Sequence, residues 1–117
     1  MIAKRYNLTP TIAGDTFNGV QFTVTLTSGG TTAPIDLTDM GIKVVFKKQG
    51  QSTVISTLEI GSGITLDDAE NGVFSIDEFT AFTTPYTYVY DMEFTYSNGT
   101  VKTYLKGNFE VLEQITV

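Results

Sequence analysis

Apolar and polar positions alternate most regularly from Tyr86 to Leu112, and this alternation predicts a long β-hairpin. Two strands, residues 86–96 and 101–112, are separated by a segment that contains Asn98-Gly99. This dipeptide is typical of a two-residue type I′ turn, because both central residues of that turn need a positive φ. Turn and pattern together predict the register of the hairpin.

The predicted register sorts the hairpin into an apolar face and a polar face. The pairs expected on the apolar face are Tyr96 with Val101, Met92 with Leu105, and Tyr88 with Phe109. Asp91 is expected opposite Lys106 on the polar face, and Tyr90 is expected to cover Gly107. A slip by one residue would mix the two faces, so the pattern and the turn chemistry agree.

Shorter alternating segments, separated by turn residues, fill the rest of the chain. Strands are expected at residues 3–10 (an edge strand), 20–27, 41–48, 53–60, 64–66 and 73–76. Weak alternation around Ile55 leaves room for a β-bulge. Residues 34–37 are expected to be a short extended piece, residues 38–41 a polar turn or one helical turn, and residues 78–85 a long connection. Because no segment has a sustained 3.6-residue period, we predict one antiparallel β-sandwich over residues 1–117, with residues 1–13 as an N-terminal arm or edge strand.

Composition and charge narrow the function classes. The net charge of −6, with seven Lys and Arg, opposes binding to nucleic acid. Cysteine and histidine are both absent, which excludes disulfides, the usual zinc-ligand sets and nucleophile systems that need histidine. No apolar run suits a signal peptide or a membrane span. We therefore expect a soluble, non-enzymatic protein made in the cytoplasm, with no cofactor and no membrane partner.

Two carboxylates on one strand could serve as a glycosidase pair. Asp91 and Glu93 stand two positions apart, so both project from the same face of the strand. That face is expected to meet solvent, and Lys106 is expected opposite Asp91. A solvated cross-strand charge pair is the preferred interpretation.

The densest group of acidic side chains is a weak candidate for calcium. Asp67, Asp68 and Glu70, followed by Asn71, offer the oxygen ligands that calcium prefers. Their spacing lacks the order of an EF-hand loop. A polar turn closed by Gly72 is therefore expected.

Tyrosines at even spacing could form a carbohydrate-stacking surface. Tyr86, Tyr88, Tyr90 and Tyr96 share their predicted face with Met92 and other apolar residues. Exposing all of them would be costly. Core packing is the preferred interpretation, with one tyrosine near the rim reaching the surface.

Several turn and strand motifs carry a family resemblance. In chain order they are Gly14-Asp15-Thr16-Phe17, Pro34-Ile35-Asp36-Leu37-Thr38-Asp39, Gly63-Ile64-Thr65-Leu66, Gly72-Val73-Phe74-Ser75-Ile76-Asp77, Tyr88-Val89-Tyr90-Asp91, and Asn98-Gly99-Thr100-Val101-Lys102-Thr103-Tyr104-Leu105-Lys106-Gly107. Together they resemble small tailed-phage virion proteins similar to the N-terminal domain of phage baseplate upper proteins. The resemblance implies an immunoglobulin-like β-sandwich of about seven to eight strands that acts as a structural adaptor in the virion.

A full baseplate upper protein continues into segments that carry or present receptor-binding proteins, whereas this sequence stops at Val117, just past its last expected strand. We therefore expect an accessory or decoration protein, or an adaptor domain, that docks on capsid or tail/baseplate proteins. Assembly in several copies through symmetric contacts is a further expectation.

Partner-binding residues are expected at the ends of the domain. The candidates are Tyr6 in the arm formed by residues 1–10, Phe79 and Phe82 in the connection formed by residues 78–84, and Ile115 and Val117 in the tail formed by residues 114–117. An alternative function from another class is a carbohydrate- or host-surface-binding module that uses exposed aromatic side chains such as Tyr86 and Tyr104. A hydrolase that uses Asp91 and Glu93 is a more remote alternative.

Overall fold

The computed structural model describes residues 4–113 of the 117-residue chain, and this part of the chain is all-β. The elements in chain order are β1 (Lys4–Arg5), β2 (Leu8–Ile12), β3 (Thr16–Phe17), β4 (Val20–Thr23), β5 (Thr25–Ser28), β6 (Thr31–Pro34), β7 (Gly41–Lys48), β8 (Val54–Ile60), β9 (Gly63–Asp68), a 3₁₀-helix (Ala69–Asn71), β10 (Val73–Ile76), β11 (Phe79–Thr80), β12 (Tyr86–Thr95) and β13 (Val101–Leu112). The predicted fold class, all-β, is confirmed.

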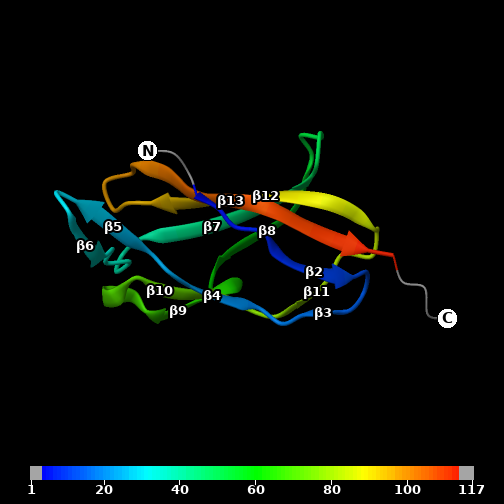
Figure 1. Ribbon diagram of the computed structural model, residues 1–117, viewed down its shortest axis with the longest axis horizontal. Helices are drawn as coiled ribbons and strands as arrows, with labels where there is room; N and C mark the ends of the chain where they lie inside the picture. The colour runs from blue at the N-terminus through cyan, green and yellow to red at the C-terminus, as the bar shows by residue number, and fades with distance from the viewer. Residues whose placement is uncertain (1–3, 114–117) are drawn as a thin grey trace.

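One large sheet holds most of the strands. Its order is β1-β13-β12-β7-β8-β9-β10-β4, and β2 also pairs with β13. The sheet curls, so that β13, β12 and β7 form one layer in Figure 1 and β4, β9 and β10 form the other. The pairs β1–β13, β2–β13 and β8–β9 are parallel. The sheet is therefore mixed, and the prediction of a purely antiparallel arrangement is wrong at these three pairs.

The long hairpin of β12 and β13 has the predicted register over most of its length. The pairs run from Tyr86–Val111 to Met92–Leu105. They include Asp91 opposite Lys106 and Tyr90 opposite Gly107, as expected. The side chains of Tyr88, Tyr90, Met92 and Phe94 are buried. The even-numbered face of β12 is thus a core face, as the alternation predicts.

Near its turn the hairpin departs from the prediction. Tyr96 accepts a hydrogen bond from the Gly99 N–H (2.9 Å) and donates its own N–H to the Thr100 oxygen (2.8 Å), so the loop has three residues. Gly99 has a φ of 89°, whereas Asn98 has no positive φ and accepts the Thr100 N–H on its side-chain oxygen at 2.9 Å. The prediction of a type I′ turn is therefore wrong. The predicted pairing of Tyr96 with Val101 is also wrong, because Val101 pairs with Thr95.

A β-bulge compensates for the extra loop residue. The register shifts between Met92 and Glu93, where Met92 pairs with Leu105 and Glu93 with Thr103. Tyr104 is the additional residue on β13. The loop and the bulge each shift the register by one residue, in opposite directions, so the two shifts cancel. The pairs from Met92–Leu105 to Tyr86–Val111 therefore have the predicted register.

The N-terminal strands run along the outer edge of β13. The Tyr6 N–H donates to the Lys106 oxygen (2.9 Å), and the Tyr90 hydroxyl donates to the Tyr6 oxygen. A Cβ on Gly107 would lie 1.9 Å from that Tyr6 oxygen, so only glycine allows the approach. Pro10 stands at an irregularity in the β2–β13 pairing, on an edge as predicted.

Three predicted strands between residues 20 and 60 have different outcomes. β7 matches the predicted strand at residues 41–48, and β8 carries a bulge at Ile55, between the pairs Lys47–Val54 and Phe46–Ser56. The strand expected at residues 20–27 is instead divided into β4 and β5.

The two layers share one aromatic core. Phe74 on β10 stacks on Phe22 of β4 at 5.4 Å between ring centroids and meets Phe94 of β12 edge-on at 5.7 Å. Phe46 of β7 lies 5.9 Å from Tyr90 and 6.0 Å from Phe109. Such ring pairs bury large areas and fix the layers against each other.

Candidate functional site

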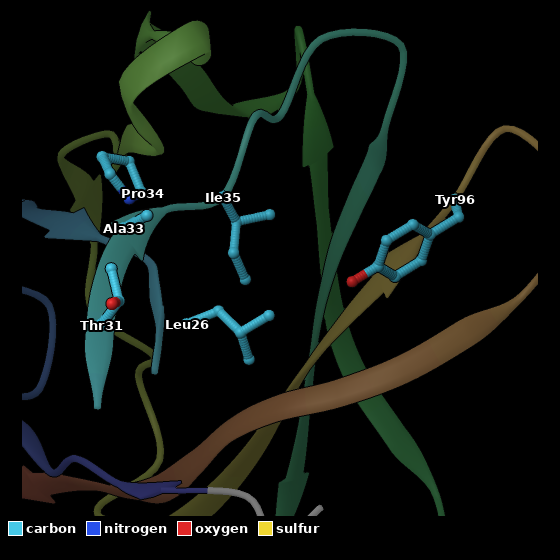
Figure 2. Close-up of a pocket in the computed structure, with 6 residues that line it drawn as sticks. All are labelled: Leu26, Thr31, Ala33, Pro34, Ile35 and Tyr96. Atoms are coloured by element: carbon cyan, nitrogen blue, oxygen red, sulfur yellow. The ribbon is translucent and has the colours of Figure 1, made fainter. Parts of the chain in front are cut away.

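An apolar groove lies between the β5–β6 hairpin and the end of β12. Its volume is about 400 Å³, and its lining consists of Leu26, Thr31, Ala33, Pro34, Ile35 and Tyr96. Figure 2 shows Leu26 and Ile35 pointing toward Tyr96 across the open space. Leu26 is 47% exposed. We refer to this feature as the hairpin groove, and its open apolar lining makes it the candidate functional site.

The hairpin leaves the large sheet at Val24. The Val24 N–H donates to the Gly72 oxygen (2.9 Å), and the Ile35 N–H donates to the Val24 oxygen (2.9 Å). Gly72 is buried with a φ of 74°, and a Cβ there would lie 2.5 Å from the Val24 oxygen. Because only glycine permits this contact, Gly72 fixes the base of the hairpin. Because Val24 bonds to Gly72 and Ile35 at this point, the chain leaves the large sheet, and β4 and β5 are separate strands.

The β5–β6 hairpin is closed by Gly29-Gly30. Ser28 pairs with Thr31, so the loop has two residues, with φ of 58° and 83°. Two positive φ values in a two-residue loop define the type I′ geometry. The turn type predicted for the long hairpin therefore occurs in the short one.

The far wall of the groove is tied to β13 through two tyrosines. The Tyr96 and Tyr104 hydroxyls form a hydrogen bond, and the Tyr104 ring meets Phe94 edge-on at 5.1 Å. Burial, followed by the hydrogen bond with Tyr96, raises the pKa of Tyr104 to about 12. The Tyr104 hydroxyl consequently remains protonated at neutral pH.

The lining of the groove suits binding through shape and backbone contacts. Its six residues carry aliphatic groups, one threonine hydroxyl and one phenol. These groups offer dispersion contacts and hydrogen bonds to a neighbouring chain.

Further apolar side chains are exposed at the opposite end of β13. Ile12 of β2 pairs with Leu112 of β13, and the two side chains are 40% and 39% exposed. In Figure 1 this end of β13 lies away from the β5–β6 hairpin. The molecule thus exposes apolar surface at both ends.

The structure places the predicted partner-binding residues in different surroundings. Tyr6 is exposed and packs edge-on against Phe22, with ring centroids 5.3 Å apart. Phe79 and Phe82 are partly buried and pack against the core. The Phe82 and Tyr88 ring centroids lie 4.6 Å apart.

Tyr6 is therefore exposed, whereas Phe79 and Phe82 are half-buried. Ile115 and Val117 lie outside the described residues. Partner binding by these five residues stays a prediction.

The acidic cluster binds its own neighbours. Asp67 accepts the Gln21 side-chain N–H at 3.2 Å and the Ser75 hydroxyl, and Asp68 accepts the Asn71 side-chain N–H at 2.8 Å. Glu70 lies in the first turn of the 3₁₀-helix. Within residues 4–113 no three acidic side chains converge in an arrangement suited to a metal ion. Gly72 closes this segment in the left-handed conformation, as the prediction of a polar turn requires.

The carboxylates proposed as a glycosidase pair lie on the outer face of β12. Asp91 is exposed and stands between Lys106 on β13 and Val45 on β7. Glu93 is half-buried, with Lys43 as its partner on β7. Asp91 opposite Lys106 is the expected cross-strand pair, whereas Glu93 is less exposed than expected.

The tyrosine series does not form an open stacking surface. Tyr88 and Tyr90 are each 1% exposed, which confirms the prediction of core packing. Burial raises the pKa of both phenols. Tyr86 is the rim tyrosine, at 40% exposure, and the Lys48 ammonium lies 5.3 Å from the centre of its ring. Within this series, Tyr86 and the half-buried Tyr96 are the tyrosines that are not buried.

Leu26 and Ile35 were missed as functional candidates by sequence reasoning. A usable signal was present, because residues 16–35 contain no Asp, Glu, Lys or Arg. Depletion of charge is characteristic of the centre of an interface. The alternation of residues 20–27 concealed it, since that pattern resembles one continuous strand.

Comparisons with known proteins leave the family open. No family model matches the sequence, and no curated protein matches it. Helical structure within residues 4–113 includes no segment with the length and apolar character needed to cross a membrane.

Proposed function

We propose that this protein is a non-enzymatic structural component of a tailed-phage virion, an accessory or decoration domain that docks on capsid or tail/baseplate proteins. The motifs that resemble phage baseplate upper proteins support the virion role. The observation that carries the docking role is the exposure of apolar side chains at both ends of the domain, with Leu26 at one end and Ile12 and Leu112 at the other.

We also infer that the curled sheet is an immunoglobulin-like sandwich. Three features support this: the N-terminal strands run parallel to the last strand, the layers share one core, and the Tyr88 hydroxyl donates to the Thr84 oxygen at 2.7 Å. A tyrosine near the start of the penultimate strand that bonds back to the preceding backbone corresponds to the tyrosine corner of immunoglobulin-like domains. A scaffold of this kind presents its loops and ends to partners.

Mass spectrometry of purified particles of the phage that encodes the chain tests the virion role. We expect the protein at a fixed number of copies per particle, retained through density-gradient purification. Its absence from purified particles would refute the proposal.

A binding experiment tests whether the end that carries Leu112 docks. Particles stripped of the protein should rebind the wild-type chain, and Leu112→Glu should bind less because a charge then enters an apolar contact. Val54→Glu is the matched control, since Val54 is 51% exposed on β8, which β7 and β12 separate from β13. Equal binding of all three chains would remove Leu112 from the contact.

A further inference from the structure

The outer edge of β5 is open in the described structure. β5 and β6 pair with each other and with no other strand among residues 4–113. β5 contains neither proline nor a charged residue, the two common devices that block an edge strand. An unblocked edge beside an apolar groove is suited to receiving a further strand.

The charge distribution favours a second copy of this chain over a charged partner as the source of that strand. Two copies of net charge −6 repel each other over most of their surfaces. The whole hairpin lies in the uncharged residues 16–35, and Tyr96 lies in the uncharged residues 94–101. Two copies can meet here without like-charge repulsion, whereas a charged partner would gain no electrostatic attraction from this surface.

The turn determines which backbone groups of β5 point outward. In a two-residue hairpin the pair beside the loop, here Ser28 and Thr31, is hydrogen-bonded, and such pairs alternate along the strands. Thr25 and Thr27 therefore direct their N–H and C=O groups away from β6. Pro34, opposite Thr25, stands at a position where the missing N–H removes no bond within the hairpin.

We propose that two copies pair β5 with β5 in antiparallel fashion around a two-fold axis at Leu26. Thr25 of each copy then exchanges two backbone hydrogen bonds with Thr27 of the other. Leu26 faces Leu26 across the axis in a pair without backbone bonds, with Cα atoms about 4.5 Å apart, and the two side chains cover the hairpin grooves. The patch is self-complementary, as a two-fold interface requires. This dimer does not depend on the virion role.

Cross-linking tests the register directly, because the chain contains no cysteine. A Cα separation of about 4.5 Å falls within the range that a disulfide can span. Leu26→Cys should give a covalent dimer on mild oxidation. Val54→Cys, at a position 51% exposed on β8, should give no covalent dimer. A Leu26→Cys chain that stays monomeric, or equal cross-linking of both variants, would overturn the proposal.

Sedimentation equilibrium of the full chain tests the non-covalent dimer. The wild type should dimerise as its concentration rises, whereas Leu26→Lys should be monomeric because two like charges would face each other. Thr27→Pro should also be monomeric, since it removes an outward N–H. Circular dichroism and denaturant unfolding should show both variants folded.

Two outcomes would contradict the proposed dimer. One is a wild-type monomer at about 1 mM, where a binding free energy of only about −4 kcal/mol would suffice. The other is a dimer that persists in both variants. In the first case, a loss of stability on Leu26→Lys would show that the groove is covered within one chain.

Discussion

The two hairpins of this molecule differ in what holds them in register. The β12–β13 hairpin buries one face in the core and has a three-residue loop with a compensating bulge. The β5–β6 hairpin has an all-exposed strand in β6 and closes with Gly29-Gly30 in the type I′ geometry. The regular type I′ turn therefore occurs in the hairpin that packs least against the core.

This difference has a physical explanation. A slip by one residue in β12–β13 would turn buried side chains such as Tyr90 and Phe94 toward solvent, so the core fixes the register and tolerates an imperfect loop. A hairpin without a buried face depends on its turn for both register and twist. The long hairpin is therefore a scaffold, and the short one is a surface element free to engage a partner.

The largest expected effect contrasts one side chain from each hairpin. Phe94 is 1% exposed and packs on Phe74, so Phe94→Ala should lower the free energy of unfolding by about 3–5 kcal/mol. Leu26→Ala should change it by about 0.5 kcal/mol or less in dilute solution, where the monomer prevails. Denaturant unfolding followed by circular dichroism measures both. Comparable losses in the two variants would abolish the distinction between scaffold and surface element.

A glycine in the scaffold hairpin gives the next largest effect. Gly107→Ala would place a Cβ 1.9 Å from the Tyr6 oxygen and 3.1 Å from the Tyr90 ring. The N-terminal strand must then move off β13, and we expect a loss of about 2–3 kcal/mol in the free energy of unfolding.

Gly41→Ala is the matched control for this substitution. A Cβ at position 41 would lie 3.6 Å from the Cβ of Thr95, which is an ordinary van der Waals contact. Gly41 also has no positive φ. Its stability should change by about 0.5 kcal/mol or less. Equal losses at both glycines would mean that the approach of Tyr6 is not what Gly107 permits.

The sequence was sufficient to predict the structure where the alternation of apolar and polar residues matches the alternation of buried and exposed side chains. It predicted the core face of β12, the strand β7, the bulge at Ile55 and the pairing of Tyr90 with Gly107. These features depend on side chains within one or two neighbouring strands, and period-2 patterns report on such local relations.

Other features depend on contacts between distant parts of the chain. The break at Val24 depends on Gly72, and the parallel pairing of β1 depends on Gly107, in each case far along the sequence. The hairpin groove likewise joins β5 and β6 to Tyr96. Alternation carries no information on such contacts, so the groove could not be predicted from it.

The smallest expected effect concerns the tyrosine pair where the scaffold hairpin meets the groove. The pKa of Tyr104 is raised to about 12 from an ordinary value of 10.0, so the folded state keeps a proton that the unfolded chain releases between these values. The stabilisation is therefore complete below pH 10 and is lost as the pH rises toward 12. Burial raises the pKa of Tyr88 and Tyr90 in the same direction, which adds to the alkaline loss.

Tyr104→Phe should make the fall in stability over this alkaline range shallower without removing it, since Tyr88 and Tyr90 still titrate with raised pKa. Denaturant unfolding at a series of pH values, with tyrosinate absorbance recorded in parallel, measures the slope. Tyr86→Phe, which removes the hydroxyl of a tyrosine exposed at the rim, is the control variant. If Tyr104→Phe and the wild type had the same slope, the Tyr96–Tyr104 contact would not persist in solution, and the far wall of the groove would be less firmly joined to the scaffold than its packing on Phe94 implies.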